Sequence, residues 1–122
     1  MESFNFYIAY IYNIYYLINY YNLKYEWLDI TKNNFFDGIK NRSYSNFSGF
    51  GNPWLDKYLS NTIELAEDIM ENGIFCPFFY QKINDKKYLI MGRHKLYSLL
   101  LYSKIKPINR KFLFIEIPNS TN

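Results

Sequence analysis

The sequence predicts a compact α+β domain: a small mixed sheet with packed helices and an added N-terminal helix. Residues 61–73 have a capped amphipathic helical pattern, residues 74–91 read as a β-hairpin, and residues 94–103 repeat leucine at helical spacing. Helices and strands interleave too irregularly for a doubly wound parallel fold. With 122 residues, the chain has the size of one domain.

The N-terminal segment has no charged residue between Glu2 and Lys24 and is long enough to span a bilayer. Its four asparagines and eight tyrosines within residues 4–25 make a membrane span a poor prediction. An apolar stripe through Ile8, Ile11 and Ile18 instead favours an amphipathic helix, while alternation over residues 8–14 keeps a strand as an alternative. We therefore assign residues 1–24 to a tyrosine-rich helix and residues 25–122 to the main domain.

The next segments predict a strand, a loop and a helix. "YEWLDIT" (residues 25–31) has the composition of a short strand, and "NRSYSNFSGFGNPW" (residues 41–54) has that of a loop. Asn61 and Glu64 form a capping-box pattern that predicts a helix start, and Asn72-Gly73 predicts its end.

A hairpin, a helix and a closing strand complete the expected order. "IFCPFFYQKI" and "KYLIM" flank the turn "NDK", and Pro77 in the first run predicts a strand at a sheet edge or a bulge. The helix over residues 94–103 follows, and "KFLFIEIP" (residues 111–118) is the last strand.

Composition limits the classes of function. The net charge of +3 permits an anionic partner but is no polybasic nucleic-acid signature, so binding of nucleic acid stays open. A single cysteine, Cys76, excludes an internal disulfide and a cysteine-based zinc site, which favours a reducing, cytoplasmic compartment. We expect no metal site built from the side chains.

The corner Gly92-Arg93-His94-Lys95 carries the clearest chemistry. Glycine allows a sharp turn or close approach, and the helix that follows begins with unpaired N–H groups and a positive dipole end. A planar guanidinium, a titratable ring and an ammonium there suit a polyphosphate. His94, near a helix N-terminus, is expected to be a neutral donor, or simply to bond a loop carbonyl.

Residues 64–100 resemble the N-terminal domain of the ParB/sulfiredoxin superfamily. "ENGIFCPFFY" is similar to the first box of that family, with Asn72, Gly73 and Pro77 in register, and "GRHKLYSL" is similar to its phosphate-binding box. The resemblance implies that Gly92, Arg93, His94 and Lys95 cradle the phosphates of a nucleoside triphosphate such as ATP or CTP, with Mg²⁺ as an accompanying ion.

Three departures separate the chain from branches of that superfamily. Sulfiredoxins have their nucleophilic cysteine where this chain has Arg93, so reduction of a sulfinic acid is not expected. The sequence given ends at "FLFIEIPNSTN", without the further domains of chromosome-partition proteins. Free-serine kinases have an aspartate where this chain has Met91.

A catalytic acid would have to come from elsewhere. Glu26 is the first choice, because the acids of the kinase branch come from near the first strand; the other candidates are Asp29, Asp37, Glu67 and Asp68. Each acid also has an ordinary reading as a solvated or helix-stabilising residue. Glu26 and His94 are therefore the catalytic candidates, and whether the chain is an enzyme stays open.

The sequence thus predicts a nucleotide-binding domain, with phosphoryl transfer or nucleotide hydrolysis as the reactions to test. Loop residues Ser48 to Gly51 and Trp54 could cover a base. The alternative is a non-catalytic phage or mobile-element protein that binds a protein partner or itself through residues 4–22. A ParB-like nuclease or DNA-binding protein ranks last.

Overall fold

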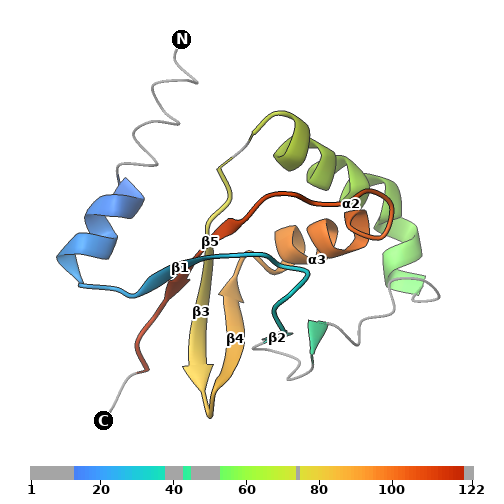
Figure 1. Ribbon diagram of the computed structural model, residues 1–122. Coiled ribbons are helices and arrows are strands. Elements are labelled where there is room, and N and C mark those ends of the chain that lie inside the picture. The colour runs from blue at the N-terminus through green and yellow to red at the C-terminus, as the bar shows by residue number, and fades with distance from the viewer. Residues whose placement is uncertain (1–12, 38–42, 45–52, 74, 120–122) are drawn as a thin grey trace.

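The computed structural model describes residues 13–37, 43–44, 53–73 and 75–119, with residues 53–61 as backbone (Figure 1). A helix covers residues 13–20. The other elements are β1 (Tyr25–Leu28), β2 (Phe35–Asp37), α2 (Pro53–Glu71), β3 (Phe78–Ile83), β4 (Lys86–Met91), α3 (Arg93–Tyr102) and β5 (Phe112–Glu116). The α+β class predicted from the sequence is confirmed.

The five strands form one mixed sheet in the order β1-β5-β3-β4-β2. β1 with β5 and β3 with β4 are antiparallel pairs, whereas β3 with β5 and β4 with β2 are parallel. The parallel pairing sets Asp37 at the end of β2 level with Leu89 of β4. Consequently the end of β2 lies close to the turn that leads from β4 into α3.

Helices α2 and α3 cover one face of the sheet. Their buried side chains Ala66, Ile69, Leu96 and Leu99 join the strand residues in one core cluster. Three rings run through this core: Phe35 stacks on Phe114 at 4.6 Å between centroids, and Phe114 stacks on Phe78 at 4.8 Å. The stack links β2, β5 and β3 beneath the helices.

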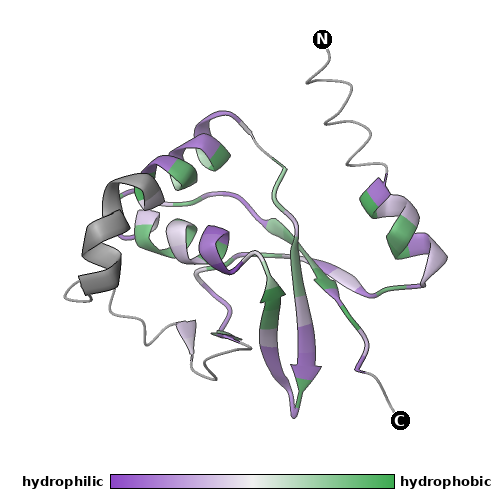
Figure 2. Ribbon diagram, turned by 180° about the vertical axis from the view of Figure 1, so that it is seen from behind, coloured by the Kyte–Doolittle hydropathy of each residue, from purple (hydrophilic) through white to green (hydrophobic). Residues whose placement is uncertain are grey.

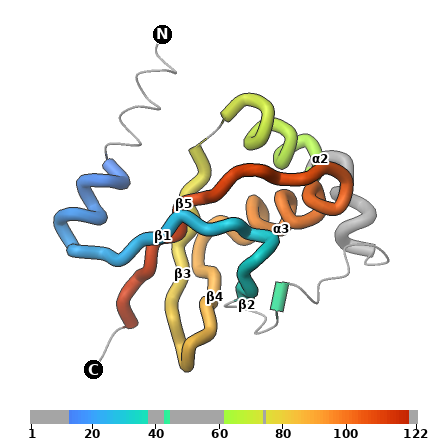
Figure 3. The backbone as a smooth tube through the Cα atoms, viewed as in Figure 1, coloured from blue at the N-terminus to red at the C-terminus, as the bar shows by residue number. Residues whose placement is uncertain are grey.

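The other face of the sheet holds the helix of residues 13–20. Ile14 and Ile18 of this helix pack against Leu113 and Ile115 of β5. Figure 3 shows the helix on the other side of β1 and β5 from α2 and α3. Because β5 is buried on both faces, its apolar residues run continuously without alternation.

The β3–β4 hairpin has the tight turn that the sequence indicates. Asn84 and Asp85 both have positive φ, of 51° and 65°, as the twist of a two-residue hairpin turn favours. Figure 2 shows that β4 changes from hydrophilic beside this turn to hydrophobic at the end that leads into α3. At this hydrophobic end only Leu89 reaches the core, whereas Ile90 and Met91 are 42% and 60% exposed.

Several sequence predictions about boundaries are wrong. α2 begins at Pro53, so Asn61 lies inside the helix and is not its cap; proline suits a first helical position because its missing N–H is not needed there. β3 is the central strand and not an edge, and Pro77 precedes it; the predicted bulge occurs instead beside Phe79. β2 was not predicted. The expected helix residues before 13 and loop residues 48–51 lie outside the described residues.

Candidate functional site

The corner between β4 and α3 forms an uncapped helix N-terminus. Gly92 is the N-cap residue, with φ 93° and ψ 17°, and its carbonyl oxygen accepts a 2.8 Å hydrogen bond from the N–H of Leu96. Within the part of the chain that the structure describes, no side chain caps this end, and the first turn contains no acidic residue. The turn therefore keeps the partial positive charge of its N–H groups, which favours an anion.

Gly92 is required by the local packing. A Cβ atom at this position would lie 2.6 Å from Cδ1 of Phe78, whose ring is fully buried. The positive φ is also unfavourable for a residue with a side chain. Glycine therefore has a structural reason here that is independent of any ligand.

Arg93 makes an ion pair that the sequence did not predict. Its Nη2 donates to Oδ2 of Asp37 over 2.7 Å, and the exposed fractions of the two side chains are 29% and 2%. One donor of Arg93 is thus held by a buried carboxylate, and the contact of Arg93 with a phosphate stays a prediction. Asp37, which the sequence offered as a candidate catalytic acid, is the carboxylate that balances the charge of this guanidinium.

Tyr44 is a third member of this cluster. Burial raises the pKa of Tyr44 to about 12; the negative charge of Asp37 adds to the increase, and Arg93 opposes it. The pKa of Arg93 is raised above its usual value, chiefly by the hydrogen bond to Asp37. These electrostatic interactions place the side chains of Asp37, Arg93 and Tyr44 close together at the end of β2.

Lys95 brings a second positive charge to the other side of the corner. Burial raises the pKa of the Cys76 thiol, and the charges of Lys95 and Arg110 partly oppose that increase. Arg110 also donates from Nη1 to the carbonyl oxygen of Ile69 at 3.0 Å. The segment containing Cys76 and Pro77 thus lies near Lys95 of the α3 corner. His94, the middle residue of the three at this corner, is exposed.

Asn72 and Gly73 lie at the end of α2 and have local roles there. The side-chain amide of Asn72 donates to Oδ1 of Asp68 over 3.1 Å, and its backbone N–H donates to the carbonyl oxygen of Asp68. Gly73 has φ 66°, the conformation that ends many helices. Asn72 and Gly73 thus have structural roles at the end of α2 that do not require a ligand.

The structure separates Glu26 from His94. Glu26 is on β1, and the backbones of β1 and β4 are three strand spacings apart, roughly 14 Å. Glu26 instead lines a hollow of about 520 Å³ together with Tyr80 and Glu116. Burial raises the pKa of Tyr80 to about 12, with further contributions from Glu116 and Glu26. The two catalytic candidates therefore do not share one site.

A magnesium ion held by protein side chains does not fit the corner well. Among the described residues, no group of three or more His, Cys, Asp or Glu side chains could hold a metal ion. The carboxylate that the contacts bring to the corner, Asp37, is already engaged by Arg93. In the same part of the chain, no helix is long and apolar enough to cross a membrane.

Comparisons with known proteins leave the resemblance to the ParB/sulfiredoxin superfamily as a prediction. No protein-family model, curated protein or solved structure matches the chain.

Proposed function

We propose that the protein binds a phosphorylated ligand, of which ATP or CTP is the form to test first, at the N-terminus of α3. The observation that carries the proposal is the first turn of this ten-residue helix, which contains no acidic residue and which no side chain of the described residues caps. Lys95 adds positive charge within this turn, and both Lys95 and Arg110 lie within electrostatic range of Cys76. Uncapped helix N-termini next to basic side chains favour phosphate groups.

In the proposed complex, phosphate oxygens accept hydrogen bonds from the first-turn N–H groups. Lys95 neutralises charge, and His94, which is exposed, donates to the outer phosphate. Arg93 acts as a positioning residue, because its bond to Asp37 ties the start of α3 to the end of β2. The proposal is binding and does not include turnover, since Asp37 is engaged as a structural partner.

A thermal-shift screen with ATP, CTP, GTP, UTP and pyrophosphate, with and without Mg²⁺, tests this function. A ligand that binds the folded state raises the apparent melting temperature by mass action. We expect a shift that Lys95→Ala reduces and that Lys106→Ala, a change at an exposed residue after α3, preserves. Equal shifts in both variants would remove the proposed site, and no shift for any compound would remove the function.

We propose self-association as the second candidate function, because the helix of residues 13–20 and the turn that follows it expose aromatic side chains. Tyr16, Tyr20 and Tyr21 are 63%, 67% and 61% exposed, and the rings of Tyr16 and Tyr20 stack at 5.8 Å. Residues 13–23 contain no charged side chain. Two copies can therefore pair through this surface without like-charge repulsion, as a symmetric interface requires.

Sedimentation velocity over a concentration series tests the second candidate. We expect a dimer that a Tyr16→Ser/Tyr20→Ser variant dissociates, because aromatic side chains contribute strongly to interfaces. The control is Tyr88→Ser, a half-buried position on β4 away from this helix. A wild-type monomer at every concentration, or a dimer unaffected by the double change, would contradict self-association through this helix.

A further inference from the structure

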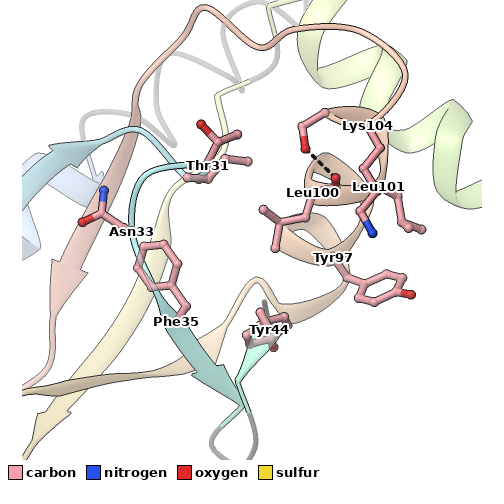
Figure 4. A pocket seen from close by; sticks show the side chains of 10 residues that line it. Thr31, Asn33, Phe35, Tyr44, Tyr97, Leu100, Leu101 and Lys104 are labelled. Atoms are coloured by element: carbon pink, nitrogen blue, oxygen red, sulfur yellow. Dashed lines mark hydrogen bonds between the residues drawn. The ribbon is translucent and has the colours of Figure 1, made fainter. Parts of the chain in front are cut away.

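A small cavity lies between α3 and the segment that connects β1 with β2. Its volume is about 180 Å³ (Figure 4). The lining is mostly apolar and aromatic: Ile30, Phe35, Tyr44, Tyr97, Leu100 and Leu101. Figure 4 shows Leu100 directed from α3 toward the side where Phe35 and Thr31 lie. None of these residues belongs to the first turn of α3.

The walls of this cavity are held by local bonds. The connecting segment is fixed at Asp29, whose Oδ1 accepts from the N–H of Thr31 at 2.9 Å and from its hydroxyl at 2.6 Å. The Asn33 side chain donates to the carbonyl oxygen of Asp29 at 2.8 Å. Phe35 is held by its stacking on Phe114. The cavity is therefore formed before any ligand enters, as is usual for small-molecule sites.

The size and the lining of the cavity indicate which apolar group of a ligand it can hold. Packed protein interiors leave few voids larger than a water molecule. An apolar cavity of about 150 Å³ is sufficient to bind benzene. The present cavity is slightly larger, so it can hold one six-membered ring or a compact branched aliphatic group, but not two fused rings together with a substituent.

The charge at the cavity indicates the polar end of the ligand. Among the described residues that line it, Lys104 is the one with a charged side chain. At the C-terminal end of α3, the carbonyl oxygens of Leu99 to Tyr102 accept hydrogen bonds from the following turn and from the Ser103 hydroxyl, so these oxygens are engaged within the protein. The Asp29 carboxylate is bonded to Thr31 and lies within electrostatic range of Lys32 and Lys111. Lys104 thus supplies the positive charge among the described residues that line the cavity.

We propose that this cavity is a binding site for a compact carboxylate whose body is a single aromatic ring or a branched aliphatic group. The apolar body fills the space between Phe35, Leu100 and Leu101, and the carboxylate remains at the rim beside Lys104. The site is independent of phosphate binding, since Lys104 follows the C-terminal end of α3 and Gly92 precedes its N-terminal end.

Nuclear magnetic resonance titrations with benzoate, benzamide and benzylammonium test this site. These three probes share one ring and differ in charge. We expect saturable shifts of the amide signals of Tyr97 and Leu101 with benzoate, weaker binding of benzamide, and the weakest binding of benzylammonium. The signals of residues 92–95 should not respond, which separates this site from the phosphate site.

Two variants test the charged and the apolar part of the proposed site separately. Lys104→Gln changes an exposed residue and should weaken benzoate binding about two- to fivefold, the effect expected of a partly exposed charge pair, without changing benzamide binding. Leu100→Trp should fill the cavity and abolish binding of all three probes. Absence of saturable shifts, or equal affinity for benzoate and benzylammonium, would overturn the proposal.

Discussion

Removal of the Arg93 guanidinium should destabilise the fold strongly. In an Arg93→Met variant, the carboxylate of Asp37, which is 2% exposed, would lose its 2.7 Å partner. Breaking a buried ion pair by removing one partner costs about 3–5 kcal/mol. Arg93 itself is 29% exposed and solvent screens part of the interaction, so we expect the lower end of this range. A domain of this size has a total stability of about 5–15 kcal/mol, and the variant should remain folded.

Urea unfolding of Arg93→Met, of Asp37→Leu and of the variant with both changes measures this effect. Arg93→Met should lower the midpoint, whereas Arg93→Met/Asp37→Leu should recover most of the loss, because no buried charge is then left uncompensated. The deficit of Arg93→Met should also shrink as the pH falls, since protonation removes the uncompensated charge of Asp37. A loss below about 1 kcal/mol, as for an exposed pair, would refute the structural role of Arg93.

Three further predictions follow from the same structure. Gly92→Ala should destabilise the protein by about 2–5 kcal/mol in urea unfolding, from the left-handed conformation and the contact with Phe78; a change below the range of measurement error would contradict the described corner. Hydrogen bonds from Thr31 lower the pKa of Asp29 below 3.8 in the folded protein. The contribution of Asp29 to stability is therefore present above pH 3.8 and is lost as the pH falls through the pKa of the folded state. Thr31→Val should move the titration of this carboxyl group, followed by NMR, toward 3.8, and an unchanged titration would contradict the contact. Burial raises the pKa of Cys76, so a thiol reagent should react with it far more slowly in the native protein than in urea, and equal rates would contradict its burial.

The parts of the fold that were predicted correctly have local signals. The β3–β4 hairpin follows from a turn at Asn84 and Asp85 between β-rich runs, and α3 follows from leucines at helical spacing. β2 has only three residues, too few to show a period, and its pairing with β4 joins segments that are far apart in sequence. The start of α2 was placed eight residues late, because Asn61 and Glu64 imitate a cap inside a longer helix.

The candidate site was predictable to a similar extent. The position of the corner could be read from Gly92 and the helix that follows, and the structure gives Gly92 the positive φ that the turn requires. The partner of Arg93 could not be predicted, because Asp37 is 56 residues away in the chain and reaches the corner only through the parallel pairing of β2 with β4. The distance between Glu26 and His94 likewise depends on the strand order.

The most direct test of phosphate binding at the α3 corner is an NMR titration of the ¹⁵N-labelled protein with ATP and CTP, each with Mg²⁺. We expect saturable shifts of the backbone amide signals of Arg93, His94 and Lys95, with a weaker response in Lys95→Ala and an unchanged one in Lys106→Ala. Saturable shifts located elsewhere, with these three amide signals unmoved, or no saturable shift with either nucleotide, would contradict it.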